Sequence, residues 1–337
     1  MPFKLAPPTI PTHYLVLSVH HSNSTVLKHK WHPNKTSIQS SRNGLRIAVS
    51  IFADMQADSK PQPTIVMGHG IGAVKDAGLA PFARAFAAHK YTAVIFDYLY
   101  IGQIAGEPRN LMNVGQQLQD FRDVISWVRS QPDKFDVGRI VAWGTSFGGM
   151  HTTALLAEDH ELAGAIAQCP CVDGLAATMQ VPFSMAFRLT WSALYDLGRS
   201  FFGFEPVYVN LTADALPGSP LAIMTGLDVM EGWKRLTPEE HVPFPNKITS
   251  RSLLSLFVHR PVRHIHRSSK PYLIVLPTWD SQAPLGAAEK AVELAPKGEG
   301  LRVPGGHFDL YFSGPAFKEN IMGQIEFLHK VLGMHST

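Results

Sequence analysis

Short apolar runs alternate along most of the chain with segments in which apolar residues recur every three or four positions. Short runs bounded by turn residues are typical of buried strands, and the longer spacing is typical of helices. The alternation predicts an α/β fold with a mostly parallel central sheet and helices on both faces. The predicted strands are 15–19, 47–52, 64–67, 91–96, 140–143, 163–169, 271–276 and 301–303. The predicted helices are 77–89, 118–128, 147–157, 287–294 and 317–332.

The pattern changes between residues 171 and 267. Large apolar side chains are frequent there, but they do not alternate as they do in strands. An interruption of this kind between two strands of one sheet predicts an inserted helical lid above the strand ends. We therefore expect an N-terminal arm at 1–45, a core formed by 46–170 and 268–337, and the lid at 171–267.

Length, composition and charge favour a globular protein over a nucleic-acid-binding or membrane-spanning one. A length of 337 residues fits one large α/β domain with an insertion or two small domains. A content of 45% hydrophobic and 17% charged residues is that of a globular protein with a substantial core. A formal net charge of +3 is too small for a dedicated nucleic-acid-binding surface. No run approaches the ~20 apolar residues of a membrane span, and prolines interrupt the region of a signal peptide. We expect a cytoplasmic protein with no nucleic-acid or membrane partner, in which Cys169 and Cys171 form no disulfide framework.

The first candidate chemistry lies in the stretch Arg139–Met150. An apolar run at 140–143 leads into Gly144–Gly148, which reads Gly-Thr-Ser-Phe-Gly, and a helical pattern follows. Strand, sharp turn and helix are the context in which a Gly-x-Ser-x-Gly pattern presents a nucleophile. Glycines on both sides of the serine leave room where strand and helix pass close together. The pattern predicts Ser146 as a nucleophile at the positive end of a helix, rather than a chance match in a glycine-rich loop.

Two further polar residues follow predicted strands late in the chain. Asp280 follows the strand at 271–276, and His307 follows the strand at 301–303. Because parallel strands end at one edge of a sheet, both side chains are expected to meet Ser146 there. His307 is expected to act as a general base, and Asp280 to hold its tautomer and stabilise the imidazolium.

Three other acidic residues compete with Asp280 for the partnership with His307. Asp309 lies two positions beyond His307, and we expect it to fix that loop. Asp228 and Asp173 lie in or near the predicted lid. Asp280 is preferred because it directly follows a predicted strand.

The strand predicted at 64–67 ends in the small residues of Gly68–Gly72. A strand that runs into small residues presents free backbone N–H groups, which can stabilise an oxyanion. We assign one donor to the backbone N–H of Ile71 and the other to that of Phe147. A phosphate-binding loop is the alternative, but the Gly-x-Gly-x-x-Gly spacing and a Walker lysine are lacking. His69 is expected either to shape this loop or to contact substrate.

Large apolar side chains in the predicted lid indicate an apolar binding pocket. Most are expected to be helix core, and some are expected to line a cavity for an apolar or aromatic substrate. The candidates for contact with substrate are Met179, Phe183, Trp191 and Trp233. The basic run at 259–267 is a candidate surface for an acidic partner such as a carrier protein, although a solvated loop is the favoured interpretation.

Six short motifs are distributed from about residue 40 to the end of the chain. They are Gly68-His69-Gly70-x-Gly72-x-x-Lys75, Phe96-Asp97-Tyr98, Gly106-Glu107-Pro108-Arg109, Trp143–Gly149, Cys169-Pro170-x-Val172-Asp173-Gly174 and Gly306-His307-Phe308-Asp309-x-Tyr311. Together they resemble one subgroup of the α/β-hydrolase superfamily, which includes dienelactone-hydrolase-like and X-Pro-peptidase-like enzymes, and in particular fungal secondary-metabolite hydrolases of the polyketide-transferase type. Ser146, Asp280 and His307 follow the chain order of the superfamily's catalytic triads.

The resemblance implies an α/β-hydrolase fold and a serine enzyme that forms an acyl-Ser146 intermediate without a metal or organic cofactor. It implies cleavage of an ester or thioester of a bulky apolar, polyketide-like acyl group in secondary metabolism. Acyl transfer to an alcohol and non-hydrolytic isomerase or cyclase chemistry stay open as alternatives, as does a binding protein on the same fold. The expected partner is a small apolar acyl substrate, and a carrier protein, a polyketide synthase and a second copy of the chain remain open.

One loop departs from the subgroup pattern. After Phe96-Asp97-Tyr98 such proteins usually carry Arg-Gly-x-Gly-x-Ser, whereas this chain has Leu99-Tyr-Ile-Gly102-Gln-Ile104. The loop is expected to border the active site. Its apolar sequence therefore leaves the substrate and the reaction type open.

Overall fold

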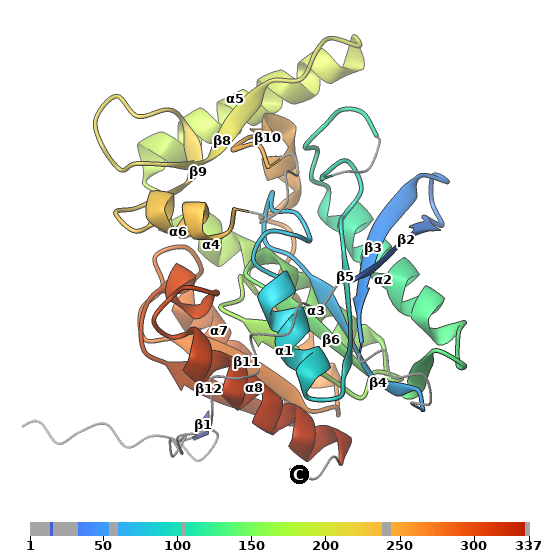
Figure 1. The fold of residues 1–337 in the computed structure, drawn as a ribbon. Helices are drawn as coiled ribbons and strands as arrows, with labels where there is room; N and C mark the ends of the chain where they lie inside the picture. The colour runs from blue at the N-terminus through green and yellow to red at the C-terminus, as the bar shows by residue number, and fades with distance from the viewer. Residues whose placement is uncertain (1–13, 16–32, 54–59, 103–105, 238–243, 334–337) are drawn as a thin grey trace, which may run out of the picture.

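Nine strands form one central sheet in the computed structural model, which describes residues 14–15, 33–53, 60–102, 106–237 and 244–333 (Figure 1). The strands are β1 (Tyr14–Leu15), β2 (Asn34–Gln39), β3 (Arg46–Phe52), β4 (Gln62–Gly68), β5 (Thr92–Phe96), β6 (Phe135–Thr145), β7 (Gly164–Gln168), β11 (Tyr272–Pro277) and β12 (Gly298–Val303). Their order is β1-β12-β11-β7-β6-β4-β5-β3-β2. β3 pairs antiparallel with β2 and β5, and the other pairings are parallel. The predicted fold class is confirmed.

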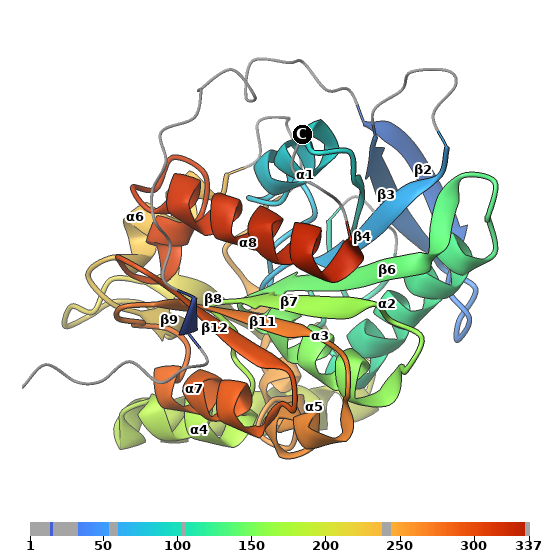
Figure 2. The same ribbon diagram turned by 90° about the horizontal axis from the view of Figure 1, so that it is seen from below.

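Helices cover both faces of this sheet. The helices are α1 (Ala80–Ala88), α2 (Val114–Arg129), α3 (Phe147–Glu158), α7 (Leu285–Leu294) and α8 (Phe317–Leu332). Figure 2 shows α1 and α8 on one face and α2, α3 and α7 on the other. Successive residues of a strand point to opposite faces, so Ile65 and Met67 of β4 pack with α1 and α8, whereas Val66 packs with α2 and α3. Both faces of a central strand are buried, which explains the uninterrupted apolar runs in the sequence.

The described parts of the expected N-terminal arm belong to the sheet. β2 pairs with β3 in a hairpin in which Gln39 lies opposite Arg46, and Gly44 adopts a φ of +69° in the turn between them. The Asn43-Gly44 pair therefore marks a hairpin, as such a pair predicts. At the other edge β1 pairs with β12. The rest of the strand expected at 15–19 lies outside the described residues.

The elements between β7 and β11 form a layer above the carboxyl ends of the central strands (Figure 1). They are α4 (Gly174–Gln180), α5 (Phe183–Phe201), β8 (Tyr208–Ala213), β9 (Ala222–Thr225), α6 (Val229–Arg235), β10 (Ile248–Thr249), and the short 3₁₀ helices η2 (Ser250–Ser255), η3 (Pro261–Arg263) and η4 (Ile265–Arg267). The three strands make a second sheet in the order β10-β8-β9. We keep 171–267 as the proposed extent of this insert.

The insert thus contains the expected helices and, in addition, three strands that the sequence does not predict. β8 alternates between buried and half-buried side chains only as far as Leu211, because Thr212 and Ala213 are both buried. So short an alternation does not stand out in the sequence.

Within the described residues, no helix is both long and apolar enough to cross a bilayer.

Candidate active site

Ser146 sits on a strained turn between β6 and α3. Its φ is +54° and its ψ is −115°, a conformation that residues with side chains rarely adopt. Its backbone N–H donates to the carbonyl oxygen of Gln168 at 2.8 Å, and its own carbonyl accepts from the N–H groups of Gly149 at 3.0 Å and Cys171 at 3.1 Å. Backbone strain of this kind persists only where the surroundings impose it, and it is concentrated at functional sites.

Glycines on both sides of Ser146 are required by close contacts of the backbone. A Cβ atom at Gly144 would overlap the carbonyl oxygen of Gly148, and one at Gly148 would overlap the carbonyl oxygen of Gly68. Both atoms belong to backbone inside the core, so neither can move aside. Gly144 and Gly148 therefore leave the room between strand and helix that the sequence pattern predicts.

We expect Gly144→Ala to lower the free energy of unfolding by about 3 kcal/mol, because the added methyl group meets backbone rather than a flexible side chain. Urea denaturation followed by circular dichroism measures this change. Gly286→Ala is the matched control, since a Cβ at Gly286 of α7 meets nothing within 4 Å. There the change should be under ~1 kcal/mol and stabilising. Equal midpoints for the two variants would contradict the argument.

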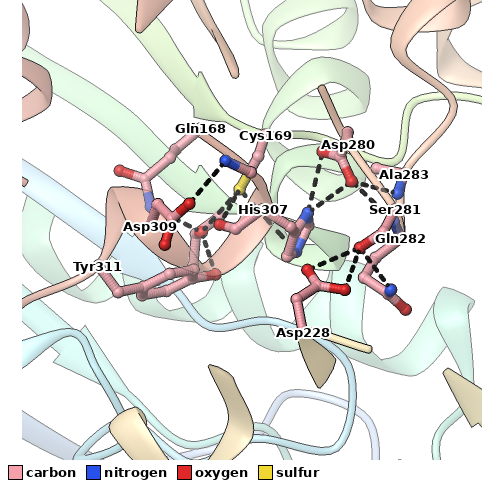
Figure 3. A network of polar contacts seen from close by, with 12 residues as sticks. Gln168, Cys169, Asp228, Asp280, Ser281, Gln282, Ala283, His307, Asp309 and Tyr311 are labelled. Atoms are coloured by element: carbon pink, nitrogen blue, oxygen red, sulfur yellow. Dashed lines mark hydrogen bonds and ion pairs between the residues drawn. The ribbon is translucent and has the colours of Figure 1, made fainter. Parts of the chain in front are cut away.

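His307 and Asp280 form a buried hydrogen-bonded pair. His307 begins the 3₁₀ helix η5 (His307–Leu310) after β12, and Asp280 follows β11. The Nδ1 atom of His307 lies 3.0 Å from Oδ1 and 2.9 Å from Oδ2 of Asp280 (Figure 3). Oδ1 of Asp280 also accepts from the backbone N–H groups of Gln282 at 2.8 Å and Ala283 at 2.7 Å. Three donors thus hold this carboxylate in one orientation.

The pair changes the acidity of the imidazole. Burial acts to lower the pKa of His307, but the carboxylate of Asp280 outweighs it, assisted by the Cys169 sulfur, so that the pKa lies well above its usual range. A raised pKa means that the protonated imidazolium is favoured over a wider range of pH. A base with this property stabilises the charge that it acquires when it takes a proton.

The competing acidic residues have other partners. Asp309 accepts from the N–H of Gly306 at 2.9 Å and from Arg235 at 3.0 Å, so it fixes the loop of His307. Asp228 accepts from Ser281 (Figure 3), and Asp173 is bound by both Nε and Nη2 of Arg260 at 2.8 Å. Within the described residues none of the three forms a hydrogen bond with His307.

The Nε2 atom of His307 lies close to the sulfur of Cys169. Nε2 lies 3.9 Å from Sγ of Cys169, and in the described part of the chain no hydrogen bond joins it to Oγ of Ser146. Cys169 is buried and has a φ of +36° at the end of β7. The sequence does not predict this contact, although the Cys169-Pro170 pair follows a predicted strand. Ser146 and His307 nevertheless line one narrow cavity.

A buried polar network lies beneath this cavity. Thr145, the neighbour of Ser146, shares a hydrogen bond of 2.6 Å with the Tyr311 hydroxyl and accepts one of 3.1 Å from Gln168. Gln168 in turn accepts from Asn320 of α8 at 2.6 Å. Satisfied buried networks of this kind restrict side chains to one arrangement. The strand end that carries Ser146 is thus tied to the helix that follows the His307 loop.

The two residues assigned as oxyanion donors border the same space as Ser146. Ile71, Ser146 and Phe147 all line a larger cavity of about 260 Å³. The loop that carries Ile71 runs against the turn, because a Cβ atom at Gly70 would lie 3.4 Å from Cβ of Ser146. Phe147 opens α3, whose positive end favours negative charge. The two backbone N–H groups remain our proposed oxyanion donors.

The larger cavity is mostly apolar and lies between α3 and the insert. The inner side of α5 supplies part of its wall through Met185, Ala186, Leu189 and Ala193, and η2 supplies Leu253. The narrow cavity is about 20 Å³, shares Ser146 with the larger one and is lined by Trp233 among others. Pockets of this character bind apolar small molecules.

Four of the expected substrate contacts are corrected. Met179, Phe183 and Trp191 are 78%, 87% and 67% exposed, so these side chains point into solvent rather than into the cavity. His69 is fully buried beside Tyr98, and its Nδ1 lies 2.9 Å from the carbonyl oxygen of Gly70. Burial lowers the pKa of His69 to about 4, so it is neutral and shapes the loop.

Two other expectations concern segments near the site. In the loop that departs from the subgroup pattern, Leu99 and Ile101 are buried in the core and line neither cavity, whereas Gln103 and Ile104 lie outside the described residues. In the basic run at 259–267, Val262 and Ile265 are buried and Arg260 is paired with Asp173, so the run is not simply a solvated loop. Among the described residues, no three His, Cys, Asp or Glu side chains are arranged to hold a metal ion.

A mostly parallel sheet with a strained serine between β6 and α3 defines the class of the α/β hydrolases. Comparison with known sequences narrows the class. The X-Pro dipeptidyl-peptidase (S15) family matches residues 43–197. The chain is 36% identical over 270 residues to the quorum-quenching protein AidA of Acinetobacter baumannii, covering 80% of this chain and 87% of AidA. It is 29% identical over 283 residues to the polyketide transferase grgF of a Penicillium species, covering 81% and 89%.

Solved structures show the same fold. The crystal structure of the α/β hydrolase GrgF from Penicillium superposes with a TM-score of 0.76 at 24% identity, covering 90% of this chain and 100% of that chain. The structure of DcsB with its substrate analogue gives a TM-score of 0.73 at 23% identity, covering 89% and 99%. The chain belongs to the α/β-hydrolase family that includes AidA and the fungal polyketide transferases, which confirms the resemblance, and it is related to hydrolases and acyl-transfer enzymes.

Proposed function

We propose that the protein is a serine hydrolase that cleaves an ester or thioester of a bulky apolar, polyketide-like acyl group. One observation carries the proposal: the Asp280-bound imidazole of His307 and the strained Ser146 line the same narrow cavity, and Ser146 also lines the larger apolar one. The polyketide transferases among the relatives support an acyl substrate of this kind.

The reaction follows from these positions in two steps. Oγ of Ser146 attacks the acyl carbon while its proton passes to Nε2 of His307, and the oxyanion accepts from the N–H groups of Ile71 and Phe147. The bond to the leaving alcohol or thiol then breaks, and that group takes the proton from His307. Water attacks the acyl-Ser146 ester by the same route, which releases the acid and restores both side chains.

The hydrogen bond between Nε2 of His307 and Oγ of Ser146 is expected to form when substrate binds. Catalytic hydrogen bonds are often long in the free enzyme and tighten in the complex. Both oxygens of Asp280 lie within hydrogen-bond distance of Nδ1 of His307, so this contact can be kept while the new one forms.

Acyl transfer to an alcohol is the second candidate, and the names of the polyketide transferases favour it. Nucleophile, base and oxyanion donors are the same in both reactions, so the competition between water and alcohol decides the product. An acyl-Ser146 adduct that persists in water but collapses when an alcohol is added would identify the transferase. An adduct that hydrolyses at the same rate with and without alcohol would identify the hydrolase.

The first test is covalent labelling with a serine-directed fluorophosphonate, followed by the mass of the intact protein. We expect one adduct on the native chain and none on Ser146→Ala, because only a serine activated by a neighbouring base reacts. Ser281→Ala is the control, since Ser281 lines the larger cavity and donates to Asp228, and its variant should still be labelled. An unlabelled native protein would favour a binding or non-hydrolytic function instead.

A further inference from the structure

The helix α5 presents apolar side chains on two opposite faces. Its buried residues are Leu189, Ala193 and Asp196, which point toward the cavity and η2. We define its outer face by the residues that share the opposite side of the helix at spacings of three and four. These are Phe187, Trp191, Leu194, Tyr195, Gly198 and Phe202, the last just after the helix end. Apart from Gly198, which has no side chain, the five residues of this face are each at least half exposed.

The exposed area is large enough for a stable interface. Phe183 and Phe201 extend the outer face at both ends and are 87% and 78% exposed. An aromatic side chain presents ~150–250 Å², so these residues together expose on the order of 900 Å². Monomeric proteins rarely leave more than a few hundred Å² of contiguous apolar surface exposed. A standard interface buries ~800 Å² from each partner, so the exposed area matches what one protomer contributes.

We propose that the outer face of α5 is the interface of a symmetric homodimer in which two copies of α5 pack antiparallel. α5 lies along the outer edge of the insert, far from β1 and the end of α8 (Figure 1). In a twofold interface the same surface meets itself. The inference does not depend on the reaction proposed above.

The outer face is complementary to itself. A twofold axis between Leu194 and Tyr195 places Trp191 of one protomer opposite Gly198 of the other, and Phe187 opposite Phe202. A Cβ atom at Gly198 would meet nothing within 4 Å inside its own protomer. The largest side chain of the face therefore meets the position that has no side chain, which is the arrangement that close helix packing requires.

The charges of α5 favour a protein partner over a lipid surface. The helix contains no lysine, and its only acidic residue, Asp196, is buried and accepts from the N–H groups of Val207 and Arg251. Arg188 and Arg199 lie at one edge of the outer face, and Arg199 stacks over Tyr195. Helices that bind lipid surfaces carry a basic polar face, whereas interface cores are rich in aromatic residues and poor in lysine and acidic residues.

Sedimentation velocity of the full chain over a wide concentration range tests the proposal. The native protein is expected to be a dimer, and Gly198→Glu should raise the dimer dissociation constant at least about 100-fold, because two carboxylates would be buried against Trp191. Gly286→Glu is the matched control, since Gly286 is also a helical glycine with nothing within 4 Å of its Cβ position. Gly286→Glu should remain a dimer, and thermal denaturation should show both variants folded.

Two further variants test the register. Trp191→Ala combined with Gly198→Trp exchanges the large and small residues across the axis, so the double variant should dimerise again where Gly198→Trp alone does not. Leu194→Cys should cross-link to its own copy on oxidation, because it lies at the axis. Arg188→Cys should not, because its two copies would lie roughly 20 Å apart along the helix at ~1.5 Å per residue.

A native chain that stays monomeric, or a dimer that survives Gly198→Glu, would overturn the proposal. Flotation with vesicles of phosphatidylcholine and phosphatidylglycerol tests the remaining explanation, which is that the outer face binds a lipid surface. A monomer that floats with the vesicles, and loses this binding in Gly198→Glu, would assign the outer face to a lipid surface instead.

Discussion

Asp280→Asn is expected to lower kcat for ester hydrolysis by about 10⁴, with little change in the fold. An amide at this position no longer supports the imidazolium, and its NH₂ group favours the tautomer of His307 in which Nδ1 accepts a hydrogen bond. The base would then lack the free lone pair at Nε2 that has to take the Ser146 proton. Single-turnover kinetics on an activated aryl ester measure the loss.

The pH dependence of the same variant gives a second readout. Activity needs neutral His307, so kcat/KM of the native enzyme should be low in acid and rise as the imidazole loses its proton. Asp280 raises the pKa of His307, and its removal should therefore move the midpoint of this rise to lower pH. A purely structural role would lower activity without moving the midpoint.

Asp309→Asn is the matched control for Asp280→Asn. Asp309 follows His307 by two residues, but its hydrogen bonds go to Gly306 and Arg235. We expect its activity to stay within about tenfold of the native value and its pH midpoint to stay in place, because it affects the loop and not the charge of the imidazole. A larger loss in Asp309→Asn than in Asp280→Asn would show that the wrong acid has been assigned.

The sequence predicts the site best where function depends on local backbone geometry. The turn at Ser146 needs glycines two residues away on both sides, and that requirement is visible as a pattern. Asp280 and His307 are 27 positions apart, yet each follows a strand of the same parallel sheet, and so their meeting could be predicted from topology. The contact of His307 with Cys169 could not, because it depends on the rotation of one side chain.

The sequence predicts the insert poorly for a different reason. Helical spacing shows which residues share a face, but α5 is apolar on two faces, and spacing does not tell which one points inward. Size alone assigns Phe183 and Trp191 to the cavity, whereas the inner face carries the smaller Ala186 and Leu189. The smaller side chains leave the space that forms the cavity. Size alone thus predicted the wrong side.

Ala186→Trp is expected to change the selectivity of the enzyme for acyl chain length. Ala186 lies on the inner side of α5 and lines the larger cavity of about 260 Å³. An indole there would occupy the space that we assign to a bulky acyl group but leave Ser146 accessible. We expect kcat/KM for an octanoyl thioester to fall about 100-fold relative to that for the acetyl thioester, since each lost apolar contact contributes ~1–3 kcal/mol to discrimination.

The acetyl thioester is the internal control, because its short chain does not extend past Ser146 into the cavity. A parallel loss on both substrates would mean that the indole disturbs the catalytic residues rather than the acyl site. Ala186→Val should give an intermediate selectivity, because it fills less of the cavity. If the octanoyl substrate were unaffected by Trp, the assignment of the acyl chain to the larger cavity would be wrong, and that cavity would hold the acceptor or the leaving group instead.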